Sequence, residues 1–229
     1  GGGGGGGGIF TGKPIIDCER FAAVLEDLLT PRTQLWHALA PEDDEIAEDQ
    51  AVKEYLERLN KAVYSQRYRP AANCASQKQQ RYASIGAFGN SAMFIDERVG
   101  GGLRYRQCHL SEVYWKESHE GRVDTVFREF DLEKRQAEAR AAEEGWQLPK
   151  QITECADPYK KFTFLHVTRP NAERVASRRD FRGMAFSSHY LVPEFKATCK
   201  VGGYWSWPWA IGRYHLGVRE MYARSPAMA

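Results

Sequence analysis

One stretch near the end of the chain constrains the fold more than any other. It reads Gly202-Gly203-Tyr204-Trp205-Ser206-Trp207-Pro208-Trp209, with four aromatic residues in six positions behind two glycines. Aromatic side chains bury a large apolar area, and glycine and proline fix where a backbone bends. A second distinctive segment, Glu220 to Met228, follows it. Neither segment contains a nucleophile motif, a metal-ligand box or a phosphate-binding loop, so we interpret both as structural signatures.

The length of the chain allows one large domain or two small ones. Its 229 residues are enough to bury a substantial core, and 12% aromatic with 27% charged residues is an ordinary globular composition. We find no apolar run of membrane-spanning length and no signal-peptide pattern, so we expect no membrane contact. Gly1 to Gly8 are eight identical glycines, which we interpret as a linker or as unassigned residues and exclude from the fold.

Charge is distributed unevenly along the chain. Residues 1–60 hold five Lys or Arg against twelve Asp or Glu, while the remainder holds 27 against 18, for a net charge of +2. The acidic part centres on Glu42-Asp43-Asp44-Glu45. Such asymmetry suits a protein that contacts both nucleic acid and protein partners, and it equally suits solvated faces of unequal sign.

The five cysteines give no sign of a disulfide framework. They stand far apart, form no C-x-x-C pair and are odd in number. We expect reduced structural thiols in a protein made in a cytosol.

The first part of the chain predicts helices. A first helix, capped by Asp17, is stopped by Pro31. A second starts after Pro41 with an acidic first turn, and a third spans residues 71–87 and ends at Gly86 or Gly89. The apolar residues of the second helix are expected to face inward; they are Val52, Tyr55, Leu56, Leu59 and Val63.

After Gly89 the periodicity changes to that of strands. Four short runs, 91–99, 103–110, 112–118 and 122–130, are separated by glycine turns and predict an antiparallel meander. Asp131 then caps a charged helix over 132–144 that Gly145 ends. This helix has almost no apolar stripe, so we expect it on a surface or against a partner. Strands return at 161–168, 185–196 and 204–214.

This order of elements predicts an α+β fold rather than βαβ units. We divide the chain into residues 9–90, a helical part, and residues 91–229, a β-rich meander or sandwich with the inserted helix 131–145.

Catalytic and metal-binding motifs have little support. Gly7-x-x-x-x-Gly12-Lys13 matches half of a phosphate-binding loop, but Pro14 stands where Ser or Thr is required. The six histidines lack zinc spacing, and His166 has the context of a hydrogen-bonded core residue. A hydrolase that uses Ser188 and His189 lacks the G-x-S-x-G elbow. We therefore predict no catalytic residue, no metal site, no cofactor and no enzyme activity.

A basic cluster over residues 174–182 leaves two interpretations open. Its arginines are Arg174, Arg178, Arg179 and Arg182. Each could neutralise a phosphate of DNA, which makes a small DNA-binding module the alternative function. Asp180 in the middle favours a solvated loop.

An ordered series of blocks resembles the head-to-tail connector, or portal, proteins of short-tailed bacteriophages. The blocks are residues 84–95, 121–129 with Arg135-Gln136, Phe164-Leu165-His166-Val167 with Arg169-Pro170, Ser187 to Tyr190, Gly202 to Tyr204, and the closing residues Pro208, Arg213, Glu220, Tyr222 and Arg224 to Met228. The resemblance covers the chain from about residue 20 onward.

This resemblance implies a ring of identical subunits, dodecameric in the family, at one vertex of the virion capsid. Through its channel a terminase motor pumps double-stranded DNA, which later leaves by the same route. Capsid, scaffold and tail adaptor proteins dock on the ring, which is assembled in the host cytoplasm. It implies a wing-type fold, with or without stem and clip elements, cut before the family's C-terminal part.

Rings need side surfaces with aromatic and arginine anchors. Candidates in this chain are Trp205, Trp207, Trp209, Arg213, Glu220, Tyr222 and Arg224. The alternative is that the three tryptophans, which would share one face of the strand 204–214, fill the core of one subunit.

Overall fold

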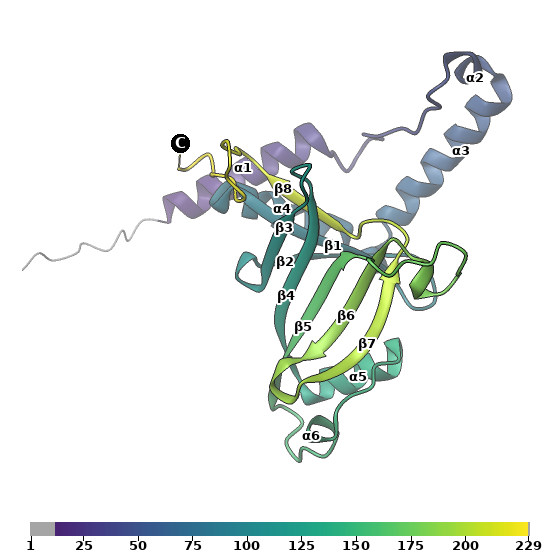
Figure 1. Ribbon diagram of the computed structural model, residues 1–229. Helices are drawn as coiled ribbons and strands as arrows, with labels where there is room; N and C mark the ends of the chain where they lie inside the picture. The colour runs from purple at the N-terminus through teal and green to yellow at the C-terminus, as the bar shows by residue number, and fades with distance from the viewer. Residues whose placement is uncertain (1–11, 229) are drawn as a thin grey trace, which may run out of the picture.

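A computed structural model describes residues 12–228 and confirms the α+β class (Figure 1). The predicted linker at residues 1–8 and Gly7 of the half-motif lie outside the described residues. The helices are α1 (Lys13–Leu29), α2 (Asp44–Glu48), α3 (Gln50–Arg67), α4 (Cys74–Phe88), α5 (Lys134–Glu144) and α6 (Lys150–Thr153). The strands are β1 (Asn90–Glu97), β2 (Leu103–Cys108), β3 (Val113–Glu117), β4 (Val123–Glu133), β5 (Lys161–Pro170), β6 (Phe186–Val192), β7 (Ala197–Tyr204) and β8 (Trp209–Arg213).

Helices α1 and α4 pack against each other, and α4 also covers β1 and β2. The predicted cap at Asp17 is wrong, because α1 begins four residues earlier at Lys13 with Pro14 in its first turn, where proline is pre-organised for a helix. The stop before Pro31 is confirmed. Helix α4 ends at Gly89, whose φ of +71° is the left-handed conformation of a helix C-cap.

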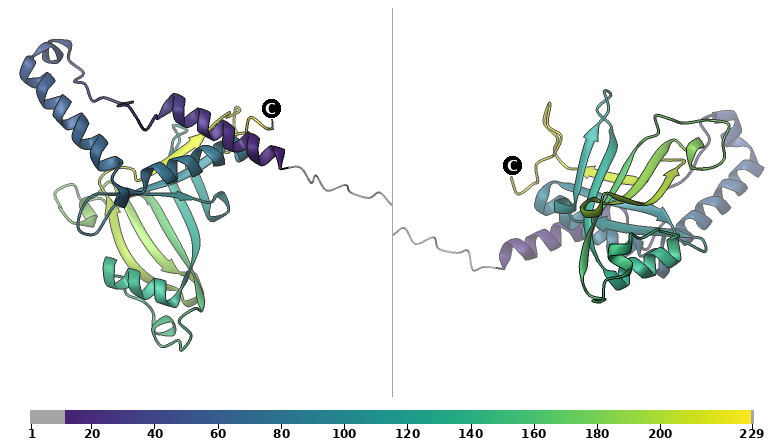
Figure 2. Two further views of the ribbon diagram at one scale, coloured as in Figure 1. Left: turned by 180° about the vertical axis from the view of Figure 1, so that it is seen from behind. Right: turned by 60° about the horizontal axis from the view of Figure 1, so that its bottom comes forward.

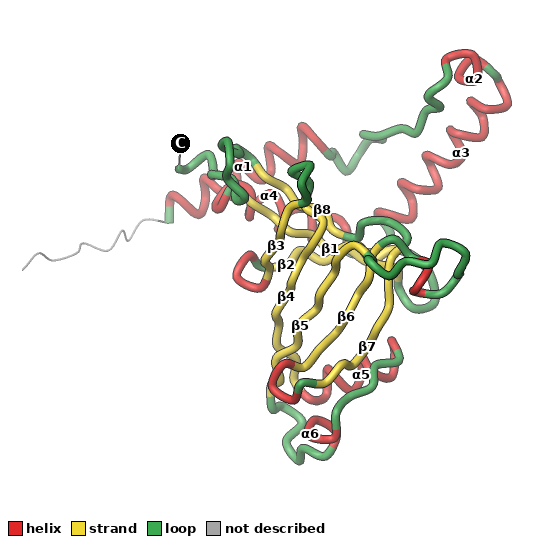
Figure 3. The backbone as a smooth tube through the Cα atoms, viewed as in Figure 1, coloured by secondary structure: helices red, strands yellow, loops and turns green. Residues whose placement is uncertain are grey.

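Helix α3 does not bury its apolar stripe in the body of the molecule. It projects outward with α2 at its tip, and residues 31–43, here called the strap, run beside it (Figures 1 and 3). We call the strap, α2 and α3 together the arm. Asn60 is the one fully buried residue of α3. Val52, Leu56, Leu59 and Val63 are half-buried and Tyr55 is 58% exposed, so the predicted inward orientation is confirmed only in part and is wrong for Tyr55. Periodicity reveals an apolar face but not what covers it.

The predicted single meander is split between two sheets. One has the order β2-β1-β8 and the other β3-β4-β5-β6-β7. A 3₁₀ turn at Leu110–Glu112 separates β2 from β3, and β8 takes the place beside β1, with Phe94 opposite Trp209. The five-stranded sheet reaches away from α1 and α4 toward α6 (Figure 3). The element β7 is absent from the predicted strands, and its last residues include the glycine pair Gly202-Gly203.

Helix α5 covers one face of the five-stranded sheet, as the view from behind shows (Figure 2, left). Its N-cap is Glu133, whose backbone amide donates to Gln136 Oε1 at 3.0 Å. The predicted cap Asp131 instead belongs to β4, where it pairs with Thr163. The end at Gly145 is confirmed. Small residues let this charged helix approach the sheet, since Ala137 is fully buried against Trp146 and Phe164.

Candidate assembly surfaces

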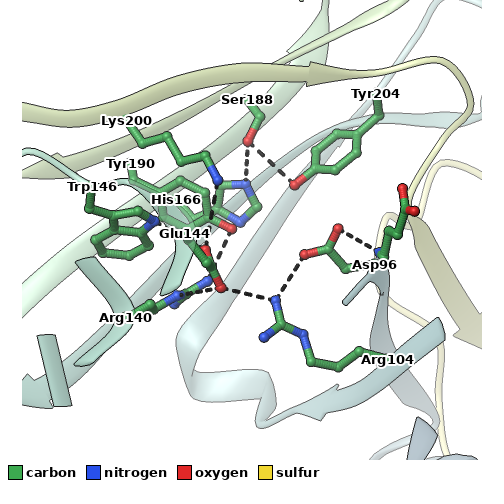
Figure 4. A network of polar contacts seen from close by, with 11 residues as sticks. Asp96, Arg104, Arg140, Glu144, Trp146, His166, Ser188, Tyr190, Lys200 and Tyr204 are labelled. Atoms are coloured by element: carbon green, nitrogen blue, oxygen red, sulfur yellow. Dashed lines mark hydrogen bonds and ion pairs between the residues drawn. The ribbon is translucent and has the colours of Figure 1, made fainter. Parts of the chain in front are cut away.

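A buried polar cluster joins the two sheets and surrounds a cavity of about 180 Å³ (Figure 4). Its centre is Glu144 at the end of α5. The carboxylate accepts from Arg104 of β2, from Arg140 of α5 and from Trp146 Nε1, each at 3.1 Å. Arg104 also donates to Asp96 of β1 at 3.0 Å. Burial would raise the pKa of Glu144, but Arg140 and Arg104 outweigh it and hold the pKa below its ordinary value.

Beside this cluster, His166 of β5 lies at the centre of the core with 1% of its surface exposed. Its Nε2 is 2.9 Å from Ser188 Oγ, and its ring stacks on Tyr190 with centroids 4.0 Å apart. Burial, reinforced by Arg140 and Arg128, lowers the pKa of His166 well below 6.5, so the imidazole is neutral. The prediction of a hydrogen-bonded core histidine is confirmed.

Ser188 lies against His166 and not against His189. Ser188 and His189 are neighbours in β6, so they point to opposite faces of the sheet. The hydrolase hypothesis that pairs them is therefore wrong. Within residues 12–228 no carboxylate hydrogen-bonds to His166, and such an orienting group is what a nucleophile-activating base needs. In the same residues no group of His, Cys, Asp and Glu side chains is arranged to hold a metal ion.

The three candidate tryptophans occupy three different environments. Trp209 is buried in the core against Phe94, with ring centroids 4.9 Å apart. Trp207 is half-buried and packs on Phe186 at 5.1 Å, and Trp205 is 57% exposed. Their predicted common strand face is wrong, because β8 begins only at Trp209 and the preceding residues form a link between β7 and β8. Of the three, Trp205 offers a partner the most surface.

The other motif residues hold the C-terminal segment onto the body. Arg213 pairs with Glu117 of β3, and Arg224 pairs with Glu220 at 2.6 Å. Tyr222 lies against the buried Trp115 with ring centroids 4.5 Å apart. These contacts are within one chain, and a role in contacts between subunits stays a prediction.

The turn at Gly89-Asn90 anchors the same segment, although sequence reasoning did not select Asn90. Its side chain donates to Ala223 O and accepts from Ala223 N, both at 2.8 Å. A Cβ on Gly89 would lie 2.3 Å from the carbonyl carbon of Arg224. Glycine is needed here both for its positive φ and for this close approach.

The basic cluster forms the hairpin loop between β5 and β6, which we call the basic loop (residues 171–185). Arg174 Nε donates to Gly183 O at 2.9 Å, and Arg178 pairs with Asp180 at 2.8 Å. Arg179 and Arg182 are exposed and form no ion pair with any residue in the described range. Two of the four arginines therefore stabilise the loop itself.

The root of the arm is held by Lys78 of α4, another residue that the sequence did not single out. Lys78 Nζ donates to Tyr68 Oη at 2.6 Å and to Thr30 O at 3.2 Å, and lies 4.9 Å from the centre of the Trp36 ring. The lysine is 7% exposed, and burial lowers its pKa. It ties the end of α1, the strap and the end of α3 together, so it sets the direction of the arm.

Comparisons with known proteins identify relatives along almost the whole chain. The family described as bacteriophage head to tail connecting protein matches residues 2–229. A probable portal protein of Bordetella phage BPP-1 is 25% identical over 206 residues, covering 87% of this chain and 36% of that protein. The portal protein of Salmonella phage epsilon15 is 24% identical over 208 residues, covering 86% of this chain and 36% of that protein. The chain thus spans about a third of the length of these curated relatives. No helix between residues 12 and 228 is long and apolar enough to cross a membrane.

Proposed function

Since the chain belongs to the bacteriophage head-to-tail connecting protein family, we propose that it forms part of a portal subunit. Identical subunits close into a ring, dodecameric as the family resemblance implies, at one vertex of the capsid. Double-stranded DNA enters and leaves the head through the channel of this ring. The observation that carries the proposal is the family match over residues 2–229.

The partners follow from this position in the virion. A terminase motor docks for packaging, capsid and scaffold proteins hold the rim, and tail adaptor proteins bind after filling. Assembly takes place in the host cytoplasm. The chain serves as a structural component without a cofactor, and the described residues form the wing of the subunit, with a helical part up to residue 90 and a β-rich part after it.

The low net charge of the chain suits a channel that does not bind DNA tightly. Each phosphate that a protein neutralises steepens the fall of log affinity with log salt concentration by about one unit. The net charge of this chain is only +2. The basic loop presents two arginines, Arg179 and Arg182, that form no ion pair within residues 12–228, and we propose them as transient phosphate contacts. This limited set supports sliding contact more than the alternative of a dedicated DNA-binding module.

The test is the particle shape of the full-length protein. Negative-stain microscopy and mass photometry of purified protein are expected to show rings of one subunit type with a central channel. A protein that stays monomeric at micromolar concentration would contradict the proposal. Rings with intrinsic ATP turnover would contradict the structural, non-enzymatic role.

A further inference from the structure

The face of the five-stranded sheet opposite α5 is not covered by any described element, and we call it the open face. It is turned toward the viewer in Figure 1, whereas α5 covers the opposite side (Figure 2, left). One cross-strand row passes over all five strands in register: Tyr114, Phe127, Val167, His189 and Val201. Leu165 and Leu191 form a second pair on the same face.

This row is unusually apolar for a sheet face that meets water. Tyr114 is 62% exposed and Val201 44%, while Phe127, Val167 and Leu165 are partly exposed. Along a strand with one face in water, polar residues on the solvated face normally alternate with apolar residues on the core face. Contiguous exposed apolar surface of this kind marks a site of contact with another protein.

The arm presents a second uncovered apolar surface. Leu35 and Leu39 of the strap, Ile46 of α2 and Tyr55 of α3 are 47% to 58% exposed. Helix α3 is 18 residues, or about 27 Å, long and buries only Asn60. Most helices in proteins owe their stability to packing of an apolar face. In α3, Val52, Leu56, Leu59 and Val63 are half-buried and Tyr55 is exposed, so the side of the helix around Tyr55 is the part left for a partner.

The arm does not lie over the open face of its own chain. In Figure 1 the open face is near the viewer and α3 projects sideways behind the plane of the sheet, whereas α3 stands forward in the view from behind (Figure 2, left). Two different surfaces of one subunit pair head to tail, and such contacts close into rings when the rotation allows.

Charge gives the contact a direction. The tip of the arm holds six acidic and no basic residues over positions 42–49. The end of the open face nearest the basic loop carries the exposed Lys116 and Arg169. Glu129 lies opposite Leu165 in the middle of β4, and Asp131 lies further toward the other end. Opposite charges at a rim fix the register and speed the encounter of two surfaces.

We propose that the arm of one copy packs across the open face of a second copy of this chain, with the acidic tip at the end that holds Lys116 and Arg169. The arm contributes Leu39 and Tyr55, and the sheet contributes Phe127 and Val201. The inference rests on the proposed ring and names the surfaces through which neighbouring subunits join.

Photo-crosslinking maps the contact directly. A benzophenone amino acid at Tyr55 of the full-length protein, irradiated in purified rings, is expected to join two copies, with the linked peptides falling within residues 113–133 or 161–204. The matched control carries the same probe at Tyr159, which is 65% exposed near α6, and is expected to give no such product. Linkage of Tyr55 only within its own copy, or to another part of a second copy, would overturn the proposal.

Charge reversal tests the direction of docking. Glu45→Lys with Glu48→Lys, and separately Lys116→Glu with Arg169→Glu, are each expected to raise the dissociation constant between subunits at least tenfold, the factor that about 1.4 kcal/mol gives. The variant with all four changes is expected to recover most of the loss. Glu143→Lys with Glu154→Lys changes two exposed acids away from both surfaces and leaves association unchanged.

The outcomes separate this inference from the proposed function. If the wild-type protein forms no rings, both the proposed function and this inference are refuted. Rings that form in the wild type, and with undiminished affinity in both charge-reversed variants, overturn the arm contact alone. If both charge-reversed variants lose affinity and the fourfold variant does not recover it, the acidic tip does not pair with Lys116 and Arg169, and the proposed direction of docking is refuted.

Discussion

At the scale of single residues, Gly89 and Gly145 show two separate reasons for a glycine. Both have a left-handed backbone, but only Gly89 also lies too close to another segment to carry a side chain. Both end a helix with φ near +70°, at +71° and +72°. A Cβ on Gly145 would meet nothing within 4 Å, while one on Gly89 would lie 2.3 Å from the backbone of Arg224. Left-handed backbone costs an alanine about 1–2 kcal/mol, so the remaining difference between the two sites comes from packing.

We therefore expect Gly145→Ala to lower the free energy of unfolding by about 1–2 kcal/mol. Gly89→Ala should lower it by a further ~1–3 kcal/mol, since the C-terminal segment must move away. Urea denaturation of the two variants and the wild type measures both values. Equal losses in the two variants would show that the contact between Gly89 and Arg224 contributes nothing.

His166 gives a pH dependence whose sign follows from its burial. The folded protein keeps this imidazole neutral, with a pKa well below 6.5. At pH values above the ordinary pKa, His166 binds no proton in either the folded or the unfolded protein, so its full contribution to stability is present. As the pH falls below 6.5 only the unfolded state takes up the proton, and stability is lost by up to about 1.4 kcal/mol per pH unit until the folded pKa is reached.

The prediction is that His166→Gln flattens the fall in stability between about pH 7 and about pH 5 relative to the wild type. Burial also lowers the pKa values of His37 and His189, and their contributions are common to both proteins. Denaturation curves at several pH values give the two slopes. Identical slopes would mean that His166 takes up a proton in the folded state as readily as in the unfolded state.

At the scale of elements, Glu144 joins α5 to the edge of the three-stranded sheet. Glu144→Gln would leave Arg104 and Arg140 without their shared anion in a partly buried site. Removing one partner from such a cluster costs about 3–5 kcal/mol when burial is complete, and a smaller loss of about 2–3 kcal/mol is expected here because Arg104 keeps Asp96. The exposed neighbour Glu143, changed to Gln, serves as the control and should lose less than ~0.5 kcal/mol. Thermal unfolding compares the two.

The elements also show how far sequence reasoning reached. Local signals were enough where they fix an end, as Pro31 does for α1 and Gly145 for α5. They were not enough where a tertiary contact decides. The amphipathic pattern of α3 gives the helix but not its projection from the body, and the predicted meander gave no reason for β8 to take the place beside β1.

The candidate surfaces follow the same division. Aromatic and arginine content pointed to the segment around Trp205, but Trp209 is a core residue because β8 begins there. The open face was not selected, although residues 162–167 are apolar at four of six positions, with Phe162 and Phe164 directed inward and Leu165 and Val167 outward. An apolar strand without alternation is the signal for a sheet with contacts on both faces.

At the scale of the whole molecule, the near-neutral charge of the chain predicts how strongly the proposed ring binds DNA. A channel for passage should bind DNA weakly, because every neutralised phosphate adds about 0.9 to the slope of log affinity against log salt. If Arg179 and Arg182 contact phosphates, replacing both with alanine in the full-length protein lowers that slope by about 2 and reduces affinity equally for all sequences. Filter binding between about 0.05 and about 0.2 M salt gives the slopes.

Lys150→Ala with Lys160→Ala removes the same charge near the opposite end of β5 and should leave the slope unchanged. A double arginine variant that abolishes all DNA binding would instead indicate a dedicated binding module, because a passage has no need of one strong contact.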